Sequence, residues 1–221
     1  MKNKSATLQT ILGGALLLLF VLFTVLVMTV DVAPIGPNGS NVGLSTINGT
    51  FHESFGYSSL FTTVSEILGF LAWIAPLLFC LLGFLQLLKR RSLRKVDADI
   101  YVLAGAYVVM IAAYVFFEVF VVNSRPILEE GILEASYPSS HTLLSLVLYG
   151  TALRHISLRI PTRSPRYALL IVVIVLLLGT VTCRLLAGVH WITDIVGGVL
   201  LGASIVCLCN GISAFFAKKG N

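Results

Sequence analysis

His190 and Asp194 have the residue types and the spacing that nucleophilic chemistry requires. They lie four residues apart at the predicted start of a helix, so both side chains fall on one face. The carboxylate can then accept a hydrogen bond from one imidazole nitrogen, which fixes the tautomer and leaves the other nitrogen free to attack. The alternative interpretation is structural, because such a pair also caps and anchors a helix start.

His141 follows a Pro-Ser-Ser sequence, residues 138–140, that predicts a helix start with a serine cap. Backbone N–H groups and the positive end of the helix dipole would point at whatever is bound there, and a phosphate oxygen suits that position. Alternatively, the serines only cap the helix and His141 anchors it at a membrane interface.

Arg125 and Arg184 are forked donors that suit the paired oxygens of a phosphate. An arginine near a membrane boundary also extends towards lipid headgroups, and Arg184 would complement the C-terminus of a helix. Their joint placement favours phosphate binding, because both arginines lie next to the histidines and the aspartate in the predicted layout.

Together these residues resemble the signature of the type 2 phosphatidic acid phosphatase superfamily, which comprises lipid phosphate phosphatases and related haloperoxidases. The signature has three parts: Lys-x6-Arg-Pro, Pro-Ser-Gly-His and Ser-Arg-x5-His-x3-Asp. The corresponding parts here are Glu118-x6-Arg125-Pro126, Pro138-Ser139-Ser140-His141 and Cys183-Arg184-x5-His190-x3-Asp194. Order and spacing agree throughout, and the resemblance extends over about residues 60–217.

By this resemblance, His190 is expected to be the nucleophile that takes the phosphoryl group, and Asp194 is expected to orient it. His141 is expected to protonate the leaving oxygen and later to activate water. No metal ion and no other cofactor is implied. The phosphate oxygens would be held by Arg125, Arg184, Ser139 and Ser140.

Three positions depart from the signature. Ser140 replaces a glycine and Cys183 replaces a serine, and both exchanges are expected to be tolerated. Glu118 replaces the lysine and reverses a charge where the family binds a dianionic phosphate, so we expect it to modulate the site. It lies two helical turns before Arg125, on the same face if the helix continues, which predicts an ion pair with Arg125 or Arg184. The alternative is a protonated carboxyl group that donates to phosphate.

The elements that must position these residues are membrane-spanning helices. The chain is 57% hydrophobic and 11% charged, whereas about a quarter of the residues of a soluble domain are charged. Its apolar runs have about the 20 residues that a helix needs to cross a hydrocarbon core of about 30 Å. The sequence therefore predicts an all-α bundle of about six spans, at residues 11–30, 65–88, 100–122, 141–158, 167–184 and 189–217.

The distribution of positive charge predicts the orientation of this bundle. Of 15 lysines and arginines, all except Arg125 and Arg184 fall on one side of the six-span layout, including those near the termini, Lys2, Lys4, Lys218 and Lys219. Because such residues gather on the cytoplasmic side, both termini are predicted to be cytoplasmic, and the site is predicted on the outer face of a plasma membrane. The net charge of +5 then reflects topology and anionic headgroups rather than nucleic acid.

A single membrane-embedded domain is predicted over residues 1–221, with an external connector at about residues 31–64. The connector is rich in turn-forming residues, although its aromatic residues also permit a short amphipathic helix at the interface. The first apolar run is expected to be a retained anchor rather than a signal peptide. Gly198 and Gly202 predict close helix packing within the monomer. The four cysteines are expected to be free thiols, and no Cys/His spacing resembles a zinc site.

These observations predict an enzyme that removes a terminal phosphate from a lipid mono- or diphosphate of the outer leaflet through a phosphohistidine intermediate. Undecaprenyl diphosphate, phosphatidylglycerophosphate and phosphatidate are the expected kinds of substrate, with the polyprenyl lipid first. One alternative is a phosphotransferase that passes the phosphoryl group from His190 to a lipid or a sugar. Another is a non-catalytic binder or carrier of lipid phosphates, although a binder has no need for an oriented nucleophile and a second histidine.

Overall fold

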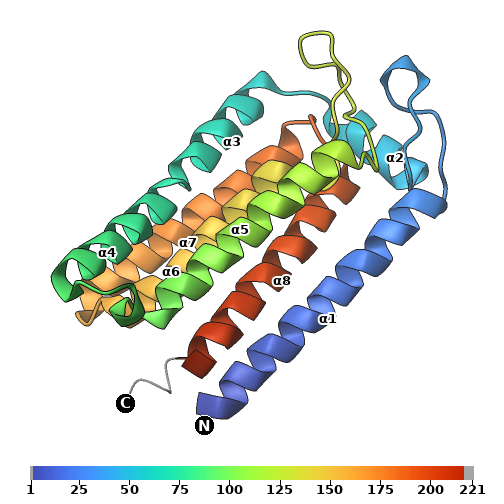
Figure 1. The fold of residues 1–221 in the computed structure, drawn as a ribbon. Coiled ribbons are helices and arrows are strands. Elements are labelled where there is room, and N and C mark those ends of the chain that lie inside the picture. The colour runs from blue at the N-terminus through green and yellow to red at the C-terminus, as the bar shows by residue number, and fades with distance from the viewer. Residues whose placement is uncertain (1, 217–221) are drawn as a thin grey trace.

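Helices make up most of residues 2–216, the part of the chain that this computed structural model describes (Figure 1). Except for the short α2, which lies at one end, the α-helices run along one bundle (Figure 1). No strand forms within these residues, only isolated β-bridges in the loops. The α-helices are α1 (Lys2–Thr29), α2 (Ser45–Phe55), α3 (Ser59–Leu71), α4 (Ile74–Arg90), α5 (Ala98–Val119), α6 (Ser140–Arg159), α7 (Arg163–Leu186) and α8 (Ile192–Phe216).

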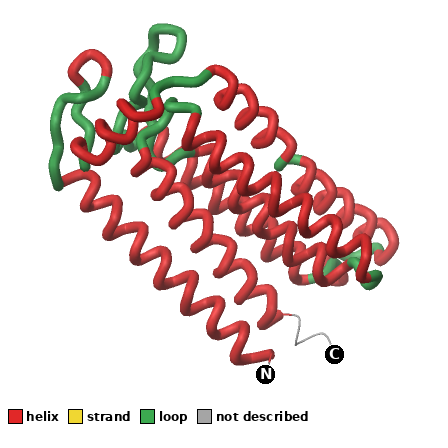
Figure 2. The backbone as a smooth tube through the Cα atoms, turned by 180° about the vertical axis from the view of Figure 1, so that it is seen from behind, coloured by secondary structure: helices red, strands yellow, loops and turns green. Residues whose placement is uncertain are grey.

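The predicted all-α membrane bundle is confirmed. Among the described residues, five segments are long and apolar enough to cross a membrane: α1, α3 together with α4, α5, α7 and α8. The remaining predicted crossing, α6, has 20 residues, and it runs alongside the others in both views of the backbone (Figures 1 and 2). It is less apolar because it carries a buried serine, two buried threonines and a buried histidine, which lie inside the bundle instead of facing lipid.

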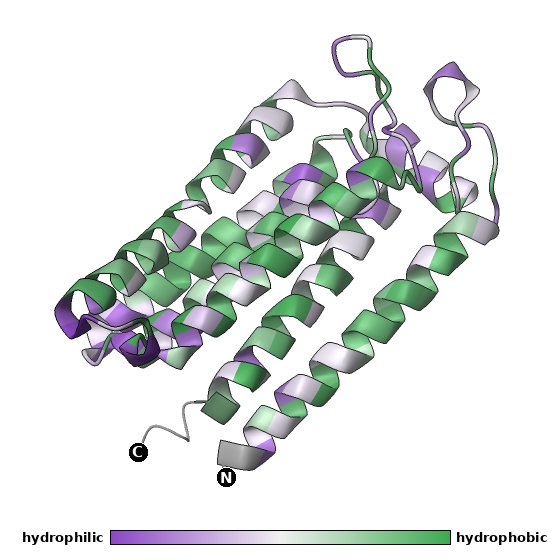
Figure 3. Cartoon of the chain, viewed as in Figure 1, coloured by the Kyte–Doolittle hydropathy of each residue, from purple (hydrophilic) through white to green (hydrophobic). Residues whose placement is uncertain are grey.

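The outer faces of the helices are apolar and exposed, as a lipid environment requires. Leucine, valine, isoleucine and phenylalanine side chains are exposed along α1, α4, α5 and α7. Figure 3 shows green, hydrophobic ribbon along the middle of the bundle and purple, hydrophilic residues towards both ends. Because lipid tails are as apolar as these side chains, packing between helices must come from close fit and hydrogen bonds rather than from hydrophobic burial alone.

Small residues provide that close fit between α8 and its neighbours. A Cβ atom on Gly198 would approach the Ser139 carbonyl oxygen to 2.9 Å, and one on Gly202 would approach Leu146 of α6 to 2.8 Å. On another face of α8, the Ser204 hydroxyl donates a hydrogen bond of 2.8 Å to the carbonyl of Gly13 in α1. The prediction that the two α8 glycines pack within the monomer is therefore confirmed.

The second predicted span is interrupted where α3 ends and α4 begins. The N–H groups of Ala72 and Trp73 bond three residues back, to Gly69 and Phe70, which is the tighter 3₁₀ pattern. Pro76 follows shortly and has no N–H group to donate, so the α-helical ladder cannot pass through unchanged. The span continues as α4 beyond this break.

The predicted connector contains a helix that packs on the bundle. The helix is α2, and its buried Asn48 donates to the hydroxyl of Thr193 at 2.9 Å, at the start of α8. Asn48 also donates to the carbonyl of Gly43 at 2.7 Å. The short helix permitted by the sequence is therefore observed in this region, and Asn48 fixes it against the start of α8.

The bundle has two distinct ends. The site end carries α2, the loop between α5 and α6, and the turn between α7 and α8; the basic end carries the loops between α4 and α5 and between α6 and α7. The start of α1 also lies at the basic end (Figure 1). Lys218 and Lys219, which contributed to the predicted orientation, lie outside the described residues.

Candidate active site

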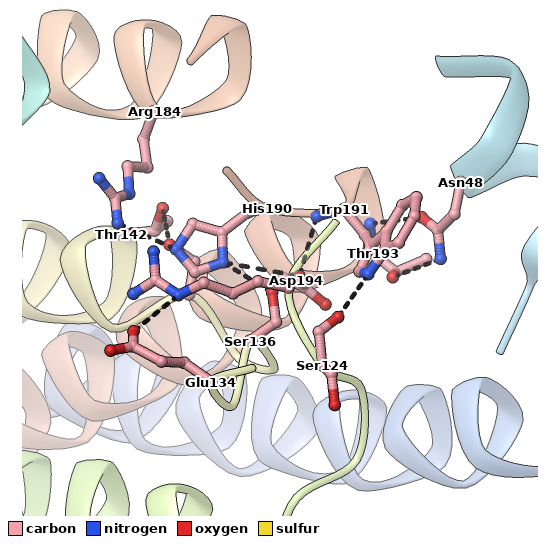
Figure 4. Close-up of polar contacts among 12 residues, drawn as sticks. Asn48, Ser124, Glu134, Ser136, Thr142, Arg184, His190, Trp191, Thr193 and Asp194 are labelled. Carbon is pink, nitrogen blue, oxygen red and sulfur yellow. Dashed lines mark hydrogen bonds and ion pairs between the residues drawn. The ribbon is translucent and has the colours of Figure 1, made fainter. Parts of the chain in front are cut away.

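The residues singled out in the sequence come together at the site end from five separate elements. Arg125 lies in the loop between α5 and α6, and His141 is in the first turn of α6. Arg184 is in the last turn of α7, His190 lies in the turn before α8, and Asp194 is in the first turn of α8. Arg184, His190 and Asp194 are all at least 95% buried. Figure 4 shows these three side chains converging with that of Ser136.

A serine stands between His190 and Asp194. The Ser136 hydroxyl lies 3.0 Å from His190 Nδ1 and donates a short hydrogen bond to Asp194 Oδ2. His190 Nδ1 and Asp194 Oδ2 are themselves 3.6 Å apart, too far for a direct hydrogen bond. The predicted direct contact is therefore replaced by a chain in which Asp194 accepts from Ser136 and Ser136 accepts from His190 Nδ1–H.

Asp194 also closes the start of α8. Its Oδ2 accepts a hydrogen bond of 2.9 Å from the backbone N–H of Trp191, the residue that precedes the helix. A side chain in the first turn that bonds back to the residue before the helix is one half of a capping box. The structural and functional interpretations of the His190–Asp194 spacing are therefore compatible. The cap fixes the position of the carboxylate that accepts the hydrogen bond from Ser136.

The other ring nitrogen of His190 faces an arginine. Arg184 Nη2 lies 3.2 Å from His190 Nε2, and an arginine can only donate, so Nε2 is the unprotonated nitrogen of the ring. His190 precedes the membrane-spanning part of α8, and its burial, with the positive charges of Arg184, Arg125 and His141, lowers its pKa well below the ordinary value. The imidazole is therefore neutral at pH 7, with its lone pair aimed at Arg184.

Arg184 has donors to spare. Its Nε and Nη1 atoms are buried and have no hydrogen-bond partner, and no carboxylate among the described residues forms an ion pair with it. A buried guanidinium without a counter-ion is costly. The arrangement suits an anion that would bind between Arg184 and His190.

Arg125 has carboxylate partners, but they are not the one predicted. Its guanidinium lies 2.8 Å from Glu129 and 3.2 Å from Glu134, both in the loop before α6. The Arg125 Nε and Nη1 atoms nevertheless have no hydrogen-bond partner, so the two carboxylates hold the guanidinium as ion pairs alone. Desolvation, with Glu129 and Glu118 nearby, raises the pKa of Glu134 above its ordinary value against the opposing effect of Arg125.

The predicted ion pair of Glu118 with Arg125 or Arg184 is wrong. The helix α5 ends at Val119, and the chain turns before Arg125, so the two-turn spacing does not carry over. Glu118 is exposed and instead lines a narrow pocket with Ser140 and His190. Its carboxylate thus lies near the predicted phosphate-binding residues without neutralising either arginine.

The predicted serine cap of α6 is also wrong. Ser139 occupies the position before the helix, but its hydroxyl accepts from Thr142 Oγ1 at 3.1 Å and makes no cap to the backbone. Its N–H donates to the carbonyl of Asp194 at 2.9 Å, which ties the start of α6 to α8. The first-turn N–H groups of a helix have no partners within the helix, so they point their partial positive charge towards the site.

His141 lies between the centre of the site and a second opening. Its Nδ1 atom is buried and has no hydrogen-bond partner. The ring packs close to Gly69 of α3, where a Cβ atom would come within 3.1 Å. Beside it is a cavity of about 160 Å³ whose lining includes Glu66, Phe70 and Trp73. Phe70 and Trp73 are exposed on the lipid-facing surface.

Ser136 was not singled out from the sequence, and neither were the partners of Arg125. Ser136 lies two residues before the Pro-Ser-Ser-His segment, and its N–H donates to the carbonyl of Asn123 at 2.9 Å. The indole N–H of Trp191 donates to the carbonyl of Ser124 at 2.7 Å and joins the same loop to the start of α8. Proximity to the motif is the one sequence signal that pointed to Ser136.

The described residues contain no group of three or more His, Cys, Asp or Glu side chains placed to hold a metal ion. The four cysteines are unpaired, as expected.

Comparison with known proteins identifies the class. Residues 120–216 match the family model described as the PAP2 superfamily, which confirms the resemblance drawn from the motifs. The matched region contains the residues of the motifs, namely Arg125, His141, Arg184, His190 and Asp194. It begins after Glu118.

Among solved structures, the fold matches a transmembrane PAP2-type phosphatidylglycerolphosphate phosphatase from Bacillus subtilis. The two share 18% sequence identity with a TM-score of 0.60, and the match covers 95% of this chain and 97% of that one. At this identity the match shows a common fold. A comparison with curated proteins gives no significant match.

Proposed function

We propose that this protein is a lipid phosphate phosphatase of the plasma membrane that acts through a phosphohistidine intermediate. The observation that carries the proposal is the buried chain from Arg184 through His190 and Ser136 to Asp194. It presents an unprotonated imidazole nitrogen to a guanidinium whose other donors are unpartnered. A binding protein would need the guanidinium but not the oriented imidazole.

In the first step, a phosphate group binds between Arg184 and His190, and its oxygens take up the free donors of the guanidinium. His190 Nε2 attacks phosphorus, the bond from phosphorus to the lipid oxygen breaks, and His141 gives its proton to that oxygen. The imidazole becomes positively charged as the new bond forms. Asp194 stabilises this charge through Ser136, in the way that a carboxylate stabilises the imidazolium of a catalytic triad.

In the second step, water attacks the phosphorus of the phosphohistidine. His141 now accepts a proton from that water, the bond between phosphorus and His190 breaks, and inorganic phosphate leaves. Arg125 and Arg184, with the N–H groups at the start of α6, would supply the positive charge that phosphoryl transfer requires, so we propose a reaction that needs no metal ion.

The cavity beside His141 is the proposed entry for the substrate. It lies next to the exposed side chains of Phe70 and Trp73, so a lipid could bring its headgroup to His141 without leaving the bilayer. Undecaprenyl diphosphate, phosphatidylglycerophosphate and phosphatidate fit this description. The activity named for the structurally similar Bacillus subtilis protein supports phosphatidylglycerophosphate as one of the first to test.

Release of phosphate from these three lipids by the purified protein tests the proposal. We expect release from at least one lipid, unchanged by EDTA, and an acid-labile phosphorylated protein that is lost with His190→Ala. Phosphate release without any phosphorylated His190 would contradict the intermediate. A protein that releases no phosphate from any of the three lipids would contradict the function.

We also propose that the site end faces outwards, because the basic end carries most of the cations. Glu130 is exposed in the loop between α5 and α6. A Glu130→Cys protein without other reactive cysteines should react with an impermeant thiol reagent in intact cells. Labelling that requires broken membranes would reverse the orientation.

A further inference from the structure

A second and larger cavity lies towards the basic end, between α4, α6 and α7. Its volume is about 410 Å³, which is within the usual range of ligand-binding cavities, and its lining is almost entirely apolar. Ala152 on α6 is buried in its floor, whereas Ile74, Leu78 and Leu169 are exposed at its rim. The cavity therefore opens sideways, towards the lipid.

The polar groups of this cavity lie at its basic end. His155 is 2% exposed, and its Nδ1 atom has no hydrogen-bond partner. Arg159 pairs through Nη2 with Asp99 at 2.7 Å, but its Nε atom is buried without a partner. Buried polar atoms without a hydrogen-bond partner are rare and costly. Two of them at one end of an apolar cavity indicate a ligand with a polar head and an apolar body.

The charge around this end favours an anionic head. Residues 89–99 and 154–166, which form the two loops of the basic end with the adjoining helix ends, contain nine lysines and arginines. Only two carboxylates, Asp97 and Asp99, oppose them. An anionic phospholipid headgroup is therefore attracted to this surface.

We propose that this cavity binds an anionic phospholipid from the leaflet at the basic end. One acyl chain would fill the space between α4, α6 and α7. The phosphate would lie at Arg159, within reach of its free Nε–H and of His155. This site is separate from the one that holds His190, and the inference does not depend on the proposed phosphatase activity.

The tail of a substrate bound at His141 is the competing occupant, and the structure favours the phospholipid. Tyr149 lines the larger cavity, and its hydroxyl donates a hydrogen bond of 2.7 Å to the carbonyl of Leu68, the residue before Gly69 in the lining of the cavity beside His141. A tail passing this contact would also end beside His155 and Arg159, which suit an anion and not a hydrocarbon. His155 lies fourteen positions after His141 on α6, or about 21 Å along the helix.

Native mass spectrometry of the full chain, released from nanodiscs that contain phosphatidylglycerol and phosphatidylcholine, tests the proposal. Phosphatidylglycerol has no terminal phosphate group, so its retention reports binding and not turnover. We expect one retained phosphatidylglycerol. Arg159→Gln should weaken its retention about ten- to a hundredfold, the effect of losing a charged hydrogen bond. Ile156→Trp, which fills the cavity without removing a polar group, should abolish retention.

Two matched variants control for general damage to the bundle. Leu158→Trp places the same bulk on an exposed position of α6, and Arg163→Gln removes a cation from the same end outside the cavity lining. Both should retain phosphatidylglycerol as the unmodified protein does. Equal retention by Ile156→Trp and Leu158→Trp would overturn the proposal, as would equal retention of the two lipids. An increased KM for a long-chain lipid phosphate in Ile156→Trp, with phosphatidylglycerol retention unchanged, would assign the cavity to the substrate tail instead.

Discussion

The bundle contains two buried histidines that face an aspartate at the same distance, one at each end. At the site end, His190 Nδ1 lies 3.6 Å from Asp194 Oδ2; at the basic end, His155 Nδ1 lies 3.6 Å from Asp99 Oδ2. Both histidine side chains are almost fully buried. Proximity of histidine and aspartate alone therefore does not distinguish the candidate active site from the other pair.

The neighbours of each pair make the difference. Ser136 connects His190 to Asp194 by hydrogen bonds, and Arg184 faces the opposite ring nitrogen with spare donors. At the basic end no hydroxyl joins His155 to Asp99, and the carboxylate is engaged directly by Arg159. A histidine nucleophile needs an oriented ring and an anion site in front of it. The pair of His190 and Asp194 has both.

The largest effect is expected from the loss of the proposed nucleophile. His190→Ala should reduce kcat by at least about a thousandfold, since no other group can take the phosphoryl group. His155→Ala should leave kcat within about threefold and should instead lower the thermal stability, because a buried side chain is lost and a cavity forms. Phosphate release and thermal unfolding of both purified variants provide the measurement. Comparable loss of kcat in the two variants would show that the pairs do not differ as the structure indicates.

The next expected effect concerns the hydroxyl between His190 and Asp194. Ser136→Ala should lower kcat about ten- to a hundredfold, the value of a buried hydrogen bond to a charged group, with little change in KM. Asp194→Asn should lower kcat about a hundred- to ten-thousandfold, because the ring loses its orienting charge.

The double variant separates a relay from two independent contacts. If Asp194 acts through Ser136, Ser136→Ala should cost little more in a protein that already carries Asp194→Asn. Effects that multiply in the double variant would mean that the carboxylate orients His190 without the serine.

The helices and the residues of the motif could be predicted because both depend on local patterns. Apolar runs of the length of a membrane identify spans, and the fixed spacings place His141, His190 and Asp194 at helix starts that meet at one end of the bundle. The break between α3 and α4 was missed. The break follows from two local features, the 3₁₀ hydrogen bond from Ala72 to the carbonyl of Gly69 and the missing N–H group of Pro76. Neither feature changes the hydropathy of the segment.

The contacts within the site could not be predicted, since they depend on how an irregular loop folds. Ser136 is one serine among several, and only the pairing of its N–H with Asn123 aims it at His190. Glu129 and Glu134 have no distinguishing pattern in the sequence, yet they reach Arg125 because the loop between α5 and α6 returns on itself.

A smaller effect is expected from the carboxylates around Arg125. Glu134→Gln should remove one ion pair and free the guanidinium for phosphate, at the cost of a less fixed side chain. Because the ion pair is partly exposed, the gain from the freed guanidinium and the loss from its less fixed position should nearly cancel. KM should therefore change by about two- to fivefold in either direction. Kinetics on one lipid phosphate at two salt concentrations measure this effect. Loss of activity comparable to that of Ser136→Ala would mean that Glu134 has a larger role in positioning Arg125.

The smallest effect is expected at Glu118, the position where this chain departs furthest from the family signature. An ion pair with Arg125 or Arg184 would have made Glu118→Gln costly, but the structure has no such pair. The exposed carboxylate instead lines the pocket with Ser140 and His190 and repels an approaching phosphate weakly. We therefore expect Glu118→Gln to lower KM by no more than about threefold with kcat unchanged, and Glu118→Lys to lower KM further, because a cation replaces the anion. These differences should shrink at high salt. A loss of kcat/KM of tenfold or more in Glu118→Gln would show that the carboxylate positions an arginine during the reaction, despite standing apart from both arginines in this structure.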